Sequence, residues 1–108
     1  MSSKVLTILG FASKAGKLSY GMDAAVSAIK QKKAKLVLAA RDVSQKSEKE
    51  IIFQSEKYGV KYLPLENYDM DTVAHAVGRK CGILSVNDDS FSSGLMTALE
   101  DGRKLNDK

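Results

Sequence analysis

Cysteine and histidine are almost absent from this chain of 108 residues. Its one cysteine, Cys81, has no second thiol to pair with, which excludes an intrachain disulfide and favours a reducing compartment. Cys81 and the one histidine, His75, are too few to ligate a structural zinc ion. A cysteine nucleophile needs a base beside it, and His75 lies six positions earlier, before a Gly-Arg-Lys turn. We therefore expect a packed thiol, a surface imidazole, no metal and no catalytic residues.

Aromatic residues and long apolar runs are also scarce. The chain has no tryptophan, four tyrosines and three phenylalanines, which disfavours a platform that stacks the bases of a single strand. No apolar run approaches the roughly 20 residues of a membrane-spanning helix. The first residues lack the hydrophobic region of a signal peptide. We expect a cytoplasmic protein with no membrane partner and no cofactor.

Positive charge is present and is unevenly spread. The formal net charge is +4, yet residues 1–50 hold ten basic and four acidic residues, whereas residues 51–108 hold seven and nine. A field concentrated in one half of the chain suits a polyanionic partner such as nucleic acid. Charge alone leaves open the alternative of a lysine-rich solvated surface.

The spacing of apolar residues predicts five helices that alternate with four short strands. The predicted strands are 17–20, 36–40, 60–65 and 82–86. The predicted helices are 4–15, one from residue 22, one capped by Ser44 or Ser47, one from Asp69 to Gly78, and one capped by Asp88 or Ser90. Short connections between these elements indicate an α/β fold, a three-layer α/β/α sandwich around a small mixed four-stranded sheet. We expect one RNA-binding-type domain over residues 1–100 and a polar C-terminal tail over residues 101–108.

Several helix details follow from the same patterns. Ser47 and Glu50 have the spacing of a capping box. Tyr58 and Phe91 fall on apolar stripes of their helices, and Met70 falls on the inward side of the fourth helix. We expect all three of these side chains to face the core.

The most informative segment is residues 9–21, which has the pattern of a helix, a basic turn with glycines, and a second helix. The turn brings Lys14, Lys17 and Gly21 to the start of the second helix. A helix start carries unpaired N–H groups and partial positive charge, so it suits a phosphate-bearing partner.

A nucleotide-hydrolysing loop fits this segment poorly. Five residues, where the P-loop has four, separate Gly10 from Gly16, and Leu18 stands where a hydroxyl must reach the metal. The Asp88-Asp89 pair is better explained as a helix cap than as an acid/base pair. Arg41 and Asp42 follow a buried strand, where α/β folds place ligand sites.

Four blocks together resemble a known family: residues 9–21, the run Ala-Lys-Leu-Val-Leu-Ala-Ala-Arg-Asp-Val at 34–43, Tyr-Gly-Val at 58–60, and Ala-Val-Gly-Arg-Lys at 76–80. Over residues 4–100 the chain resembles the L7Ae and L30e type of ribosomal protein, and more closely its small stand-alone bacterial members. The resemblance implies the α/β/α sandwich. It also implies binding of kink-turn RNA, whose sheared G·A pairs present purine edges.

The family motif at the second helix is Gly-x-Asn-Glu-x-x-Lys, which falls here on Gly21, Asp23, Ala24 and Ser27. Asp23 stands at the Asn position of the motif and still provides a hydrogen-bond acceptor, either for capping the helix or for a guanine edge. The family often has an acidic residue after the central strand, and Arg41 occupies that position here. The family's second contact loop corresponds to residues 78–82. The basic turn, the other cations and these motif positions together give the predicted RNA-binding residues: Lys14, Lys17, Gly21, Met22, Asp23, Ser27, Arg41, Arg79 and Lys80.

These observations predict a non-enzymatic RNA-binding protein, associated with the ribosome or another structured RNA and contacting phosphates and purine edges. Ribosomal or other proteins are further expected partners. The alternative is a protein–protein interaction module of the same fold, because the growth-arrest stress proteins resemble it in architecture and bind proteins. The missing Asn, Glu and Lys of the family motif motivate that alternative.

Overall fold

Nine elements alternate along the chain in the computed structural model, which describes residues 3–106 and the side chains of residues 3–100. They are α1 (Lys4–Lys14), β1 (Leu18–Tyr20), α2 (Met22–Lys30), β2 (Leu36–Ala40), α3 (Gln45–Lys57), β3 (Lys61–Leu65), α4 (Met70–Val77), β4 (Ile83–Val86) and α5 (Asp89–Asn106). Helix α5 thus covers residues 101–106 of the segment that we expected to be a polar tail, and residues 107–108 lie outside the described part.

The four strands form one sheet in the order β1-β4-β2-β3. Strand β4 runs antiparallel to both of its neighbours, so Val86 lies opposite Leu18 on one side and Leu36 on the other. Strands β2 and β3 are parallel, with Leu36 opposite Lys61. The prediction of a mixed four-stranded sheet is confirmed.

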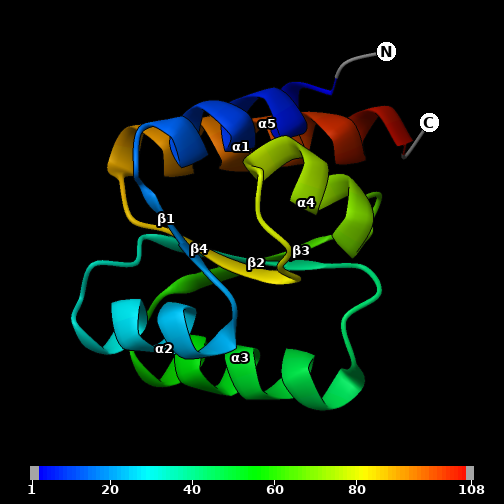
Figure 1. Ribbon diagram of the computed structural model, residues 1–108. Coiled ribbons are helices and arrows are strands. Elements are labelled where there is room, and N and C mark those ends of the chain that lie inside the picture. The colour runs from blue at the N-terminus through cyan, green and yellow to red at the C-terminus, as the bar shows by residue number, and fades with distance from the viewer. Residues whose placement is uncertain (1–2, 107–108) are drawn as a thin grey trace.

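Helices cover both faces of this sheet, as Figure 1 shows: α1, α4 and α5 lie on one face, and α2 and α3 on the other. Strand β2 is buried along its whole length and alternates between the two cores. Leu36 and Leu38 pack under α1, α4 and α5, whereas Val37 and Ala39 pack against α2 and α3. This double burial explains why the strand reads as an unbroken apolar run.

Side chains cap the helices largely as predicted. Asp69 caps α4 by accepting from the Thr72 N–H at 2.8 Å, and Gly78 ends that helix with a left-handed φ of 78°. Asp88 accepts from the Phe91 N–H at the start of α5. These features fix the helix ends that border the connections between layers.

Helix α3 begins differently from the predicted capping box. Ser44 is its N-cap and accepts from the Ser47 N–H at 3.1 Å, so Ser47 is the third residue of the helix and the Ser47–Glu50 box is wrong. The helix therefore begins about one turn earlier than the Ser-x-x-Glu pattern suggested, with Ser44 as the capping residue.

Two aromatic or apolar side chains lie farther out than predicted. Tyr58 is 41% exposed because it follows the last turn of α3, and Met70 is 37% exposed because it starts α4 at the edge of the fold. Phe91 is half-buried and packs against the α1, α4 and α5 core, as expected. Among the residues described, no helix combines the length and apolarity needed to cross a membrane.

Candidate nucleic-acid interface

One edge of the sheet gathers the start of α2, the end of β2 and the α4–β4 connection. The Gly21 N–H donates to the Ile83 carbonyl at 2.8 Å, and the Ala40 N–H donates to the Gly82 carbonyl at 2.8 Å. Residues 21, 40 and 82–83 are far apart in the sequence, and these hydrogen bonds make them adjacent in the fold.

The start of α2 is open at this edge. Gly21 is the N-cap, and no side chain makes a capping hydrogen bond to the first turn. Its φ of 90° is a conformation that glycine adopts without strain. Asp23 is exposed on the first turn of α2 and does not cap the helix. Of the two roles expected for its carboxylate, capping is therefore excluded. The N–H groups of this turn therefore point out of the N-terminal end of α2, where an anion or a hydrogen-bond acceptor of a base is favoured.

A groove of about 330 Å³ opens beside this helix start. We call it the α2 groove; it is lined by Gly21, Met22, Val43, Ser44, Ser47, Met70, Gly82 and Ile83. Its floor is tightly packed, because a Cβ on Gly82 would lie 2.7 Å from both Met70 Sδ and Val43 Cγ1. Apolar side chains and two serine hydroxyls thus share one concave surface, a combination common in ligand sites.

Arg41 follows the end of β2 at this edge of the sheet and does not itself line the α2 groove. Its backbone N–H donates to the Tyr68 carbonyl at 2.9 Å, and its guanidinium lies 3.8 Å from Asp69 Oδ2. The hydrogen bond from the Thr72 N–H, assisted by the Arg41 charge, holds the pKa of Asp69 below its usual range. The Arg41 side chain is 57% exposed, so this surface ion pair leaves it accessible to a phosphate.

Arg79 lies in the α4–β4 connection, outside the lining of the α2 groove. Its guanidinium carbon lies 4.9 Å from the centre of the Tyr20 ring, over the residue that precedes Gly21. Arg79 and Lys80 line a shallow hollow of about 360 Å³ together with Ala74, His75 and Gly78. Burial raises the pKa of the neighbouring Cys81 thiol, although the Arg79 charge opposes the shift. Cys81 is therefore a packed neutral thiol.

Three of the sequence-derived residues lie away from the α2 groove. Lys17 sits at the opposite end of β1 from Gly21, where its carbonyl accepts from the Asn87 N–H at 2.8 Å. Lys14 is the last residue of α1 and precedes Lys17 by three residues, so it also lies at that end. Ser27 is farther along α2 and accepts from the Gln31 amide at 2.9 Å. The structure thus brings together Gly21, Met22, Asp23, Arg41, Arg79 and Lys80, and separates Lys14, Lys17 and Ser27 from them.

The groove also has residues that were not predicted from the sequence as site residues. Val43, Ser44 and Ser47 follow β2, Met70 starts α4, and Gly82 precedes β4. The close packing of Met70 and Val43 against Gly82 would have been the signal, but recognising it requires knowing the sheet order. Within residues 3–100, no three His, Cys, Asp or Glu side chains cluster in a way that could hold a metal ion.

The fold and the segments at this edge are those of one protein family. Residues 3–95 match the sequence profile of the Ribosomal protein L7Ae/L30e/S12e/Gadd45 family, and the chain belongs to that family.

Among individual proteins, the chain is 26% identical over 97 residues to the RNA-binding protein YlxQ of Enterococcus faecium, covering 90% of this chain and 92% of that protein. It is 28% identical over 94 residues to the RNA-binding protein YlxQ of Bacillus subtilis (strain 168), with coverages of 86% and 92%. A solved structure of a protein of unknown function from Bacillus halodurans C superposes with a TM-score of 0.86 at 22% identity, covering 92% of this chain and 99% of that one. That likeness shows the fold.

Proposed function

We propose that this chain is a cytoplasmic, non-enzymatic protein that binds structured RNA, of kink-turn type, at the α2 groove. The observation that carries the proposal is an uncapped helix start beside an apolar groove, at the same edge of the sheet as two exposed arginines, Arg41 and Arg79. Two relatives named RNA-binding proteins support it, as does membership of a ribosomal protein family.

The groove offers separate partners for the separate parts of an RNA. Arg41, Arg79 and Lys80 are cations for phosphates, which supply affinity. The N–H groups of the first α2 turn and the Asp23 carboxylate suit purine edges, which supply specificity. Met22, Val43 and Met70 present apolar surface to a base or ribose that leaves its stack. The proposed RNA contacts are Gly21, Met22, Asp23, Arg41, Arg79 and Lys80.

A second function is favoured by one observation. Phe11 and Phe53 are 59% and 58% exposed on α1 and α3, and exposed aromatic side chains are enriched where proteins meet. A protein–protein interaction module of the same fold accounts for them. Purification of tagged protein with and without ribonuclease distinguishes the two functions, because a protein partner survives the nuclease and an RNA-mediated one does not.

The direct test is fluorescence anisotropy with three labelled RNAs at several salt concentrations. They are a kink-turn, the same RNA with its two G·A pairs replaced by Watson–Crick pairs, and an unbroken duplex. We expect the kink-turn to bind most tightly and all three to weaken with salt. Equal affinity for all three would contradict kink-turn recognition, and no binding near 50 mM salt would contradict RNA binding at this groove.

A further inference from the structure

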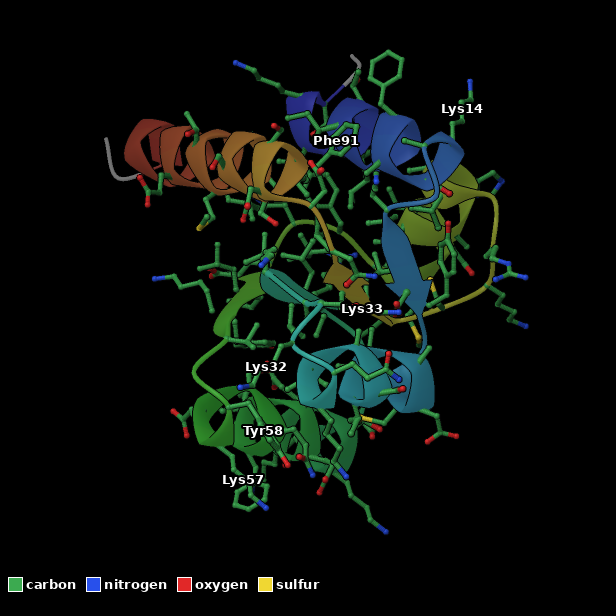
Figure 2. All side chains as sticks on the ribbon, turned by 90° about the vertical axis from the view of Figure 1, so that its left-hand side faces the viewer. Lys14, Lys32, Lys33, Lys57, Tyr58 and Phe91 are labelled. Atoms are coloured by element: carbon green, nitrogen blue, oxygen red, sulfur yellow. The ribbon has the colours of Figure 1, made fainter. Side chains whose placement is uncertain are left out.

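The end of the sheet opposite the α2 groove carries a second set of cations. Strands β1, β2 and β3 all begin there, and the connections that lead into them come from α1, α2 and α3. We call this surface the lysine edge; it consists of Lys14, Lys17, Lys32, Lys33, Lys35, Lys57 and Lys61. All seven residues are exposed. Figure 2 looks onto this side of the molecule, with Lys14 above the sheet, Lys33 at its level, and Lys32 and Lys57 below it.

Strand register places three of these lysines in a row. Lys17 and Lys35 flank the end of β4, because the Asn87 N–H donates to the Lys17 carbonyl and the Lys35 N–H donates to the Val86 carbonyl, both at 2.8 Å. Lys61 lies opposite Leu36, the next residue after Lys35. Since the strands follow the order β1-β4-β2-β3 and neighbours lie about 4.8 Å apart, the row is about 14 Å long.

The backbone holds this row in place. Lys32 has a left-handed φ of 63°, the one non-glycine residue with positive φ among those described. It reverses the chain after α2, so that the N–H groups of Lys33 and Ala34 both donate to the Ala28 carbonyl. The lysines that follow therefore extend from a closed turn that is anchored to the helix and the sheet.

The cations of the lysine edge form no ion pair with a carboxylate of residues 3–100. The ion pair formed by residues 3–100 joins Arg41 to Asp69 at the other end of the sheet, and none of the seven lysines takes part in one. The acids nearby are Glu56, Asp88 and Asp89, and the Asp88 carboxylate already accepts from the Phe91 N–H at 2.9 Å. Lys57 lies over the rings of Phe53 and Tyr58, 6.0 and 5.7 Å from their centres. Lysines outnumber acids on this surface, and like charges gathered without ion-pair partners favour an external polyanion.

We propose that the lysine edge is a second RNA-binding surface, which takes the phosphate backbone of a duplex and lets one protein molecule hold two RNA segments. The inference rests on the proposed function for its first RNA. The five residues of β2, at about 3.3 Å each, separate the two ends of the sheet by about 17 Å. One phosphate group cannot contact both ends. Flexible ammonium groups in a row suit successive phosphates of any sequence, since they carry charge without a fixed donor geometry.

The test compares two charge-matched variants by anisotropy on an unbroken RNA duplex. Lys33→Gln/Lys35→Gln neutralises two cations of the lysine edge, and Lys4→Gln/Lys49→Gln neutralises two exposed lysines outside it. We expect the first variant to bind the duplex several-fold more weakly and to flatten the slope of log K against log salt by about two. The control should stay close to wild type. Equal slopes for the first variant and wild type, or equal losses in both variants, would overturn the proposal.

A bridging assay separates this surface from the α2 groove. Immobilised kink-turn RNA is loaded with protein, and capture of a labelled duplex is measured. Wild type should capture the duplex, whereas Lys33→Gln/Lys35→Gln should bind the kink-turn RNA and fail to capture it. Kink-turn binding by wild type without duplex capture would overturn only the second surface. Duplex binding that depends on Lys33 and Lys35, without any preference for the kink-turn, would overturn only the proposed function. Circular dichroism melts confirm that each variant is folded.

Discussion

The guanidinium of Arg79 lies over the ring of Tyr20, 4.9 Å from its centre, and so ties the α4–β4 connection to β1. The Tyr20 hydroxyl lies 2.6 Å from Ser13 Oγ, which in turn donates to the Val77 carbonyl at 2.7 Å. Three elements thereby position one of the two arginines beside the α2 groove. Because the arginine stacks on a ring next to Gly21, its position depends on Ser13, Tyr20 and Val77, which are outside the proposed set of RNA contacts.

This relationship predicts different outcomes for two Tyr20 variants. Tyr20→Leu removes the cation–π contact, which contributes about 0.5–1 kcal/mol at an exposed site, so we expect RNA affinity to fall a few-fold. Tyr20→Phe keeps the ring and should keep the affinity, while the lost hydroxyl contact lowers the free energy of unfolding by about 1 kcal/mol. Anisotropy and urea unfolding measure the two effects. Unchanged RNA affinity in Tyr20→Leu would show that Arg79 does not need the ring.

The cations of the α4–β4 connection should contribute to the binding of kink-turn RNA. We expect Arg79→Ala/Lys80→Ala to weaken kink-turn binding and to flatten its salt slope by about two, since each lost phosphate contact removes about one unit. Lys4→Ala/Lys49→Ala removes the same charge from exposed positions away from the groove. A slope that changes as much in this control would mean that net charge, and not the site, drives association.

Several features of the fold were predictable because they depend on local sequence. Asp69 and Gly78 bound α4 through side-chain and backbone conformations that act within a few residues. The apolar run at 36–40 requires a strand covered on both faces. The start of α2 at Gly21 was found for the same reason. Local signals were thus sufficient to predict the helices and strands, and also the start of α2, which lines one side of the α2 groove.

Which residues meet at the candidate site depends on the order of strands in the sheet, and no local pattern encodes that order. Lys17 and Gly21 are four residues apart in sequence, and an extended strand places them at opposite ends of the sheet. Conversely, Gly82 reaches Val43 and Met70 only because β4 inserts between β1 and β2. Tyr58 lies at the end of α3 just where the apolar stripe leaves the core, so spacing alone placed it inside.

The floor of the α2 groove gives a stability prediction with an internal control. In Gly82→Ala the new methyl would lie 2.7 Å from Met70 Sδ and Val43 Cγ1, and overpacking of this kind costs about 1–3 kcal/mol. In Gly94→Ala the nearest atom is Ile8 Cδ1 at 3.6 Å, and alanine favours the α5 helix by about 1 kcal/mol.

Thermal unfolding should therefore move in opposite directions for the two glycine variants. Gly82→Ala should also weaken RNA binding, because Met70 and Val43 must shift within the groove, while Gly94→Ala should bind as wild type does. A Gly82→Ala protein with a wild-type melting temperature and wild-type affinity would contradict the described packing.

Burial of Cys81 makes a pH-dependent prediction. The raised pKa keeps the thiol neutral in the folded protein at pH values where an unfolded chain, with a usual pKa of 9.0, begins to ionise. Iodoacetamide should therefore label native protein far more slowly than protein in urea at pH 8.5. Stability associated with the thiol is present below pH 9 and declines as the pH rises above it. Equally fast labelling of native protein would show an accessible thiolate.

The central claim is that structured RNA binds at the α2 groove, and backbone amide chemical shifts report on it most directly. ¹⁵N-labelled protein titrated with one equivalent of kink-turn RNA should show its largest shifts at residues 21–25, 41–47 and 78–82, with the Gly21→Ala variant showing much smaller ones. Shifts confined to other surfaces, or no shifts near 50 mM salt, would contradict the account.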